Sequence, residues 1–199
     1  MPITNIHEEV ALNISNKYKA LNTNDFYLGN YAPDSVNLNG LAEKNLRWIA
    51  HQRKNNLNDW RKSLKEFYQK EKNNYSKEFL LGYITHILTD IIYDDLFYDD
   101  VTKLIKMDYP HSTDTHSIMG EDMKKYVYNS KYKNEITTIL NSINAYYNIL
   151  NITDEMMETF KNKVLKEEYN IDNSIYINEE LIVKLSQQVM NELKEYIED

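Results

Sequence analysis

Cysteine is absent from this chain of 199 residues. Its absence excludes disulfide frameworks, thiolate zinc sites, iron–sulfur clusters and cysteine nucleophiles. Any metal site in the protein must therefore draw its ligands from histidine, aspartate, glutamate and water.

Glycine and proline are scarce, with four and three residues respectively. Because an all-β domain needs many tight turns, this scarcity favours long helices and an all-α fold. Hydrophobic residues make up 42% of the chain and charged residues 27%, which are ordinary values for a globular protein. We expect residues 1–199 to form a single compact helical domain that buries a substantial core.

Long apolar runs and excess positive charge are also missing. No stretch of 18 apolar residues occurs, so a transmembrane segment is not expected. The first fifteen residues hold two glutamates and no lysine or arginine, which does not fit a secretory signal and leads us to expect a cytoplasmic protein. The formal net charge of −8 disfavours duplex nucleic acid and anionic lipid surfaces as partners.

Apolar residues recur at three- and four-residue spacing over most of the chain, which predicts about seven helices. The predicted helical segments are residues 6–21, 41–71 with an interruption at 51–58, 78–98, 121–129, 134–150, 153–168 and 178–198. Residues 78–98 are apolar on nearly every side, which indicates the central helix. Polar segments at 23–40 and 106–122 are expected to be loops, and Thr153 and Asn178 are expected to cap helices.

The predicted central helix contains the first pair of residues that could bind a metal. In GYITHILTD, His86 and Asp90 are four residues apart, so both side chains leave the same helix face. This spacing suits two ligands of one zinc-like ion, although a hydrogen-bonded surface pair would share it. Ile84, Ile87 and Leu88 indicate burial, and buried polar side chains need partners, which a metal would supply.

Three more polar residues are candidates only in combination. His7 lies on the apolar stripe of residues 6–21 and is expected to point inward, where a backbone carbonyl could also be its partner. Asp34 follows a proline and fits a turn or a helix cap. His51 begins a polar run near a helix end, where a surface position is the simpler interpretation.

The order and context of these residues resemble the zinc-dependent phospholipase C family, which is related to the three-zinc single-strand nucleases. Four segments carry the resemblance: NIHEEVA, FYLGNYAPDS, WIAHQRKNN and GYITHILTDIIYDDLF. They span about residues 1–98, roughly half of the chain. The resemblance implies an all-helical fold with metal ions in a cleft at the ends and faces of several helices.

The resemblance also implies a set of zinc ligands. Asp34, His51, His86 and Asp90 would hold one zinc, while His7 and Asp90 would contribute to a second, with Asp90 bridging the two ions. In the family the N-terminal amine and carbonyl also bind metal, whereas this chain begins six residues before His7. A third zinc would need two histidines and a carboxylate farther along, and these residue types occur, at a different spacing, at His111, Asp114, His116, Glu121 and Asp122. These histidines could instead line the cleft or be solvated.

The activity that the resemblance implies is zinc-dependent hydrolysis of a phosphodiester, in a phospholipid or a smaller molecule, by a metal-activated water. Asp34 is our candidate for the general base. The 17 tyrosines could form a rim for a lipid headgroup or could be ordinary boundary residues. Members of the family are commonly exported, in contrast to the cytoplasmic location expected here.

Two other functions remain open at this point. A single-strand nuclease would need basic residues and stacking aromatic residues along its cleft. A non-catalytic helical binding protein would retain metal only for the folding energy that the ion supplies.

Overall fold

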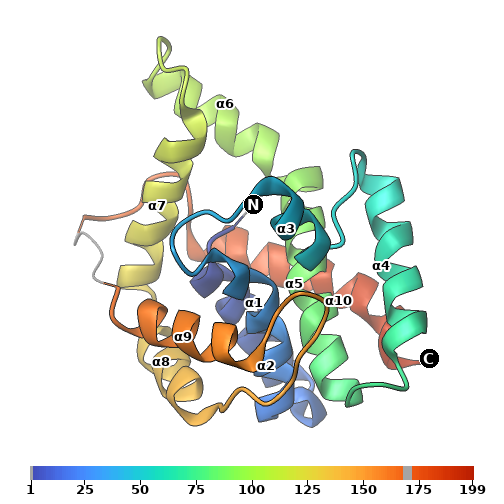
Figure 1. Ribbon diagram of the computed structural model, residues 1–199. Coiled ribbons are helices and arrows are strands. Elements are labelled where there is room, and N and C mark those ends of the chain that lie inside the picture. The colour runs from blue at the N-terminus through green and yellow to red at the C-terminus, as the bar shows by residue number, and fades with distance from the viewer. Residues whose placement is uncertain (1, 168–171) are drawn as a thin grey trace.

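The computed structural model describes residues 2–167 and 172–199, and this part of the chain is all-α, as predicted (Figure 1). It contains ten α-helices and two 3₁₀ helices, and the only β contact within it is an isolated bridge between Ile149 and Ile152. The elements are α1 (Thr4–Lys17), η1 (Lys19–Leu21), α2 (Asn24–Tyr31), η2 (Ala32–Asn37), α3 (Lys44–Ala50), α4 (Leu57–Glu71), α5 (Lys77–Leu96), α6 (Tyr98–Asp108), α7 (Thr115–Asn129), α8 (Lys133–Ser142), α9 (Asp154–Leu165) and α10 (Glu179–Ile197).

Helix α5 is the central helix that the apolar pattern predicts. Its residues from Phe79 to Tyr93 are all buried, including its polar ones, and it contacts α1, α2, α4, α6 and α10. Ser76 begins the helix by accepting a hydrogen bond from the backbone N–H of Phe79 at 3.2 Å. The buried apolar side chains of the described residues form one connected core around it. The polar side chains of Thr85, His86, Thr89 and Asp90 on α5 therefore lie in the centre of the protein.

The expected number of about seven helices is wrong, because ten α-helices form in the described residues. One of the missed helices is α2, in a segment expected to be a loop. Residues Phe26 to Tyr31 are all buried, so α2 lacks the alternation of polar and apolar faces on which the prediction depends. Gly29 of α2 allows close packing against another helix and does not mark a turn.

The other expected loop is shorter than predicted. Helix α6 continues to Asp108 and α7 begins at Thr115, so only residues 109–114 connect them. Helix α6 was missed because just two of its side chains, Val101 and Ile105, are buried, which is too weak an apolar stripe to recognise. The expected caps are confirmed, since Thr153 and Asn178 accept hydrogen bonds from the N–H groups at the starts of α9 and α10.

Helices α2 and α5 pack backbone against backbone through two glycines. A Cβ atom at Gly82 would lie 1.9 Å from the carbonyl oxygen of Phe26, and one at Gly29 would lie 1.9 Å from that of Phe79. No side chain fits at either position. The close approach also brings the Asn30 carbonyl of α2 within 2.7 Å of a histidine nitrogen of α5.

Gly82→Ala is therefore expected to lower the free energy of unfolding by about 3 kcal/mol or more, because the two backbones must separate. Urea titration followed by circular dichroism would measure the change. Gly120→Ala is the matched control, since a Cβ at Gly120 of α7 meets no atom within 4 Å. That variant should be unchanged or more stable by up to about 1 kcal/mol, and equal destabilisation of both variants would contradict the role of the close packing.

No helix within the described residues combines the length and apolar character needed to cross a membrane.

Candidate metal centre

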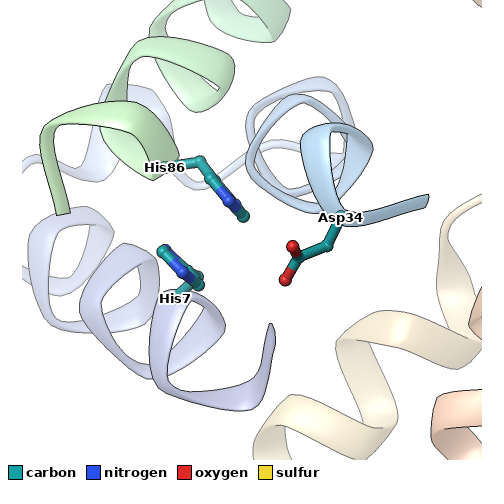
Figure 2. A group of neighbouring side chains, drawn as sticks. All are labelled: His7, Asp34 and His86. Atoms are coloured by element: carbon teal, nitrogen blue, oxygen red, sulfur yellow. The ribbon is translucent and has the colours of Figure 1, made fainter. Parts of the chain in front are cut away.

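Five predicted ligand residues meet in the interior of the protein. His7 comes from α1, Asp34 from η2, His51 from the C-terminal end of α3, and His86 and Asp90 from α5. All five side chains are buried. Figure 2 shows His7, Asp34 and His86 converging from three separate elements. We call these five residues the His/Asp cluster.

The distances inside the His/Asp cluster are short enough for its side chains to be ligands of a shared metal ion. The Nε2 atoms of His51 and His86 lie 3.3 Å apart, and His51 Nε2 lies 3.4 Å from Asp34 Oδ1. His7 Nε2 lies 3.4 Å from Asp90 Oδ1, while Asp90 Oδ2 lies 3.8 Å from His51 Nε2 and 4.0 Å from His86 Nε2. Asp90 thus faces all three histidines, as a bridging carboxylate must.

Backbone carbonyls orient two of the imidazole rings. His86 Nδ1 lies 2.7 Å from the Asn30 carbonyl oxygen, and His51 Nδ1 lies 2.9 Å from the Arg47 carbonyl oxygen. A carbonyl can only accept, so Nδ1 of each ring carries the proton and the Nε2 lone pair of a neutral ring faces the cluster. With both rings neutral, two nitrogen lone pairs and two carboxylates face one another, an arrangement that a cation between them stabilises. Without a metal ion, a proton on His51, next to Asp34 and Asp90, does the same.

Unpartnered polar atoms lead to the same conclusion. Both carboxylate oxygens of Asp90 and the Nδ1 of His7 are buried without a hydrogen-bond partner. A buried carboxylate without hydrogen bonds is costly, and coordination to a metal ion removes that cost. Among the described residues, two groups of three have ligand atoms within 4.8 Å of one another: His7, Asp34 and His86, and His51, His86 and Asp90. Imidazole and carboxylate are ligands that zinc accepts, so the residues present fit this ion.

The electrostatics of the cluster favour ionised carboxylates. Burial acts to raise the pKa of Asp34, but its hydrogen bond with His51 and the neighbouring imidazoles outweigh burial and hold it well below its usual range. The pKa of Asp90 is lowered in the same way, mainly by His7, against the opposing effect of burial. Both groups are therefore available as anionic ligands at neutral pH.

The buried surroundings shift the pKa values of His86 and His51 in opposite directions. Burial and the adjacent His7 lower the pKa of His86 to about 3, so its ring is neutral and ready to bind a metal. Burial also acts against a charge on His51, but the carboxylates of Asp34 and Asp90 outweigh it and raise the pKa. A metal ion that binds His51 must displace a proton from it, and zinc affinity consequently falls as the pH falls.

Comparison with protein families gives a match to this chain. The family model described as "Zinc dependent phospholipase C" covers residues 3–171 of the 199. The chain belongs to the zinc-dependent phospholipase C family. Searches of curated proteins and of solved structures gave no match. Membership supports zinc as the metal of the family's site and a phospholipase C type of activity.

Several residues that the sequence did not single out position the ligands of this zinc-dependent phospholipase C family member. Thr4 Oγ1 donates a hydrogen bond to Asp34 Oδ2 at 2.7 Å, and Trp60 Nε1 donates one to the His51 carbonyl at 2.8 Å. The Asn30 side chain donates to Glu8, whose pKa is raised to about 8 by burial and, despite that hydrogen bond, by the charge of Asp34. Such contacts join distant segments, so no local pattern indicates them.

A cleft of about 970 Å³ opens beside the His/Asp cluster, and Asp34 belongs to both. Pro2 and Thr4 also line it, so the N-terminal segment reaches the cleft, while Met1 lies outside the described residues. Asp34 is the member of the His/Asp cluster that lines the cleft, so the cluster borders the cleft at this residue.

The candidates for a third metal site do not assemble into one, as no three of them form a metal-binding group among the described residues. Asp114 caps α7 by accepting from the Ser117 N–H at 3.0 Å, and Glu121 is paired with Lys124. Asp122 is buried, but its oxygens accept hydrogen bonds from three consecutive backbone N–H groups at residues 175–177. His111 is exposed, and His116 lines the cleft, which is the alternative that the sequence left open.

Proposed function

We propose that this chain is a zinc-dependent phosphodiesterase of the phospholipase C type, acting on a phospholipid or a smaller phosphodiester, with the His/Asp cluster as its metal centre. The observation that carries the proposal is the position of Asp34, which lies inside the buried cluster and also lines the cleft. A purely structural metal site has no need of a cleft beside it. The proposal treats residues 1–199 as one catalytic domain.

For two zinc ions we propose the ligand set that the resemblance to the family implies. Asp34, His51, His86 and Asp90 would hold one ion, and His7 and Asp90 would hold the second. The two oxygens of Asp90 support a bridging role, because Oδ1 faces His7 and Oδ2 faces His51 and His86. His7 also lies close enough to Asp34 and His86 for these three to share an ion.

Zinc, when bound, supplies a Lewis acid that lowers the pKa of water and stabilises negative charge on phosphoryl oxygens. The chain supplies the proton acceptor and its orientation. We assign Asp34 Oδ1 as the proton acceptor for the attacking water, while Thr4 holds Oδ2 with a hydrogen bond of 2.7 Å. Because the pKa of Asp34 lies well below its usual range, Asp34 is a weak base, and its part depends on water that zinc has made more acidic. Asn37 adds a longer contact of 3.4 Å to Oδ1, which keeps the carboxylate pointing in one direction.

The test is hydrolysis by zinc-loaded protein of a phosphatidylcholine analogue and of single-stranded DNA. The proposal predicts release of a phosphorylated headgroup from the lipid and little cleavage of DNA. Faster cleavage of DNA would favour a nuclease, and bound zinc with hydrolysis of neither substrate would favour a metal-stabilised binding protein. Chelation with EDTA should abolish the activity, and zinc should restore it.

A further inference from the structure

The cleft is basic, although the protein as a whole is acidic. Five side chains in its lining are cationic: Arg47, Arg53, Lys54, Lys124 and Lys163. The complete chain carries a formal net charge of −8. Positive charge gathered in a concave site, against the sign of the whole molecule, attracts anions to that site.

The cleft lining contains fewer carboxylates than cations, and some of these carboxylates already have partners. Asp34, Asp94 and Glu167 line it, so cations outnumber carboxylates by five to three. Asp34 belongs to the His/Asp cluster, and Asp94 accepts a hydrogen bond from Arg53 at 2.9 Å. Two of the cations are also paired, Arg53 with Asp94 and Lys124 with Glu121. The positive charge available in the lining therefore comes from Arg47, Lys54 and Lys163.

Arg47 lies next to the His/Asp cluster. Its carbonyl oxygen faces His51 Nδ1 at 2.9 Å, and its side-chain Nε donates to the Ala42 carbonyl at 2.8 Å. Because a carbonyl is neutral, this contact fixes the guanidinium without compensating its charge. A fixed guanidinium presents its remaining N–H groups as a fork that matches carboxylate and phosphate oxygens.

Lys163 reaches the same region from α9. Its ammonium donates a hydrogen bond of 3.2 Å to the Asn37 carbonyl, and the Asn37 side chain contacts Asp34 Oδ1 at 3.4 Å. One residue thus separates this ammonium from the cluster, and its carbonyl partner again leaves the positive charge uncompensated.

Arg53 and Lys54 extend the basic lining on the side of α4. The Arg53 guanidinium lies 4.5 Å from the ring centroid of Trp60, whose Nε1 holds the His51 carbonyl. This stacking gives the arginine a defined position. The next residue, Lys54, is exposed and also lines the cleft, where its ammonium can contact an anionic group of a bound molecule.

We call the cationic lining residues Arg47, Arg53, Lys54, Lys124 and Lys163 the basic wall. We propose that the basic wall binds a second anionic group on the substrate, so that the enzyme prefers a phosphodiester whose headgroup carries an additional carboxylate or phosphate over one with a choline headgroup. The inference rests on the proposed phosphodiesterase function. A quaternary ammonium is recognised by aromatic faces and carboxylates, and a surplus of lysine and arginine repels it. The headgroup's second charge would contact Arg47, Lys54 or Lys163 while its phosphodiester lies at the His/Asp cluster.

A lipid headgroup fits this cleft better than a polynucleotide does. The cleft volume of about 970 Å³ is that of a site for a small molecule. A long polyanion, like an anionic bilayer, would also have to approach the rest of a surface whose net charge is −8, whereas a single short-chain lipid would not. At the lining, Leu41 is 76% exposed and offers an apolar contact of the kind that the glycerol and acyl part of a lipid would need.

The test compares zinc-loaded protein on phosphatidylcholine, phosphatidylserine and phosphatidylinositol 4-phosphate with identical short acyl chains. We expect kcat/KM for one or both anionic lipids to exceed that for phosphatidylcholine at least about tenfold, with the preference shrinking as salt is raised. The serine and inositol phosphate arms separate a carboxylate from a phosphate as the second group. An equal or higher value for phosphatidylcholine, or faster cleavage of single-stranded DNA than of any lipid, would overturn the inference.

Charge-reversal variants assign the preference to the cleft. Lys54→Glu/Lys163→Glu should lower the ratio of anionic to choline kcat/KM about tenfold. Lys62→Glu/Lys65→Glu makes the same change of charge on the exposed face of α4, where the two side chains are 75% and 58% exposed, and should leave the ratio within about twofold. Equal effects of the two double variants would reject the basic wall as the cause.

Binding of the released headgroups separates this inference from the proposed function. Calorimetric titration of zinc-loaded protein with phosphocholine, phosphoserine and inositol 1,4-bisphosphate requires no turnover. We expect at least about tenfold tighter binding of one of the two more anionic compounds, weakened by Lys54→Glu/Lys163→Glu. If no lipid is hydrolysed, the proposed function fails, and these affinities still decide whether the cleft selects anions. Equal affinities for all three compounds would overturn the inference that the basic wall selects the more anionic headgroup.

Discussion

Replacing both His86 and Asp90 by alanine is expected to remove the bound zinc and to lower phosphodiester kcat/KM at least about 1,000-fold. Asp90 is a proposed ligand of both zinc ions and His86 of one, and Asp90 faces all three histidines of the His/Asp cluster. Without them, three of the five ligands remain, and they lie on three different elements. Such a remnant lacks the ligand number that zinc requires.

Elemental mass spectrometry would measure this loss on protein purified without chelator and without nickel affinity resin. Wild-type protein should contain about two zinc ions per chain, and the double variant should contain almost none. Wild-type protein that holds no zinc, even after incubation with it, would contradict the metal centre and leave the cluster as buried polar packing.

The matched control for the double variant is His111→Ala/Asp114→Ala. It removes the same two residue types from an exposed region, and both were candidates for a third metal site. We expect zinc content and activity to stay at wild-type values. Because Asp114 caps α7, its loss should lower the stability slightly, which thermal unfolding would detect. Loss of one zinc ion from this control would instead support a third metal site at these residues.

The pair on the central helix was predictable from the sequence alone. A period of 3.6 residues places His86 and Asp90 on one face, and the isoleucines around them indicate burial. His7, Asp34 and His51 could be added only through the resemblance to a family. Tertiary packing brings α1 and η2 onto α5 and places His51 within 3.3 Å of His86. The close packing at Gly29 and Gly82, which brings α2 onto α5, leaves no periodic signal.

Composition alone was misleading where residues of the right type lie in the wrong places. Asp122 has the chemistry of a ligand, but three backbone N–H groups near Tyr176 occupy its oxygens. Only the folded structure shows that these donors surround the carboxylate. The same holds for the basic cleft, which collects Arg47, Lys124 and Lys163 from α3, α7 and α9 of an acidic chain.

Asp34→Asn is expected to lower kcat by about 100-fold to 10,000-fold while most of the zinc stays bound. Asparagine keeps the shape of the side chain and a carbonyl oxygen that can accept the hydrogen bond from Thr4. It cannot accept a proton from water, which is the role that we propose for Oδ1. The remaining four residues of the His/Asp cluster still offer ligands for the metal.

Steady-state kinetics and zinc analysis on the same preparations separate the two roles of Asp34. Asp94→Asn is the matched control, because it removes a carboxylate from the same cleft, one that accepts a hydrogen bond from Arg53. Its kcat should fall less than about fivefold, since a salt bridge at the edge of the cleft contributes little to a step at the metal centre. Full activity of Asp34→Asn would reject the general-base role. Loss of zinc as complete as in the His86 and Asp90 double variant would instead make Asp34 an essential ligand, whose removal alone accounts for the lost turnover.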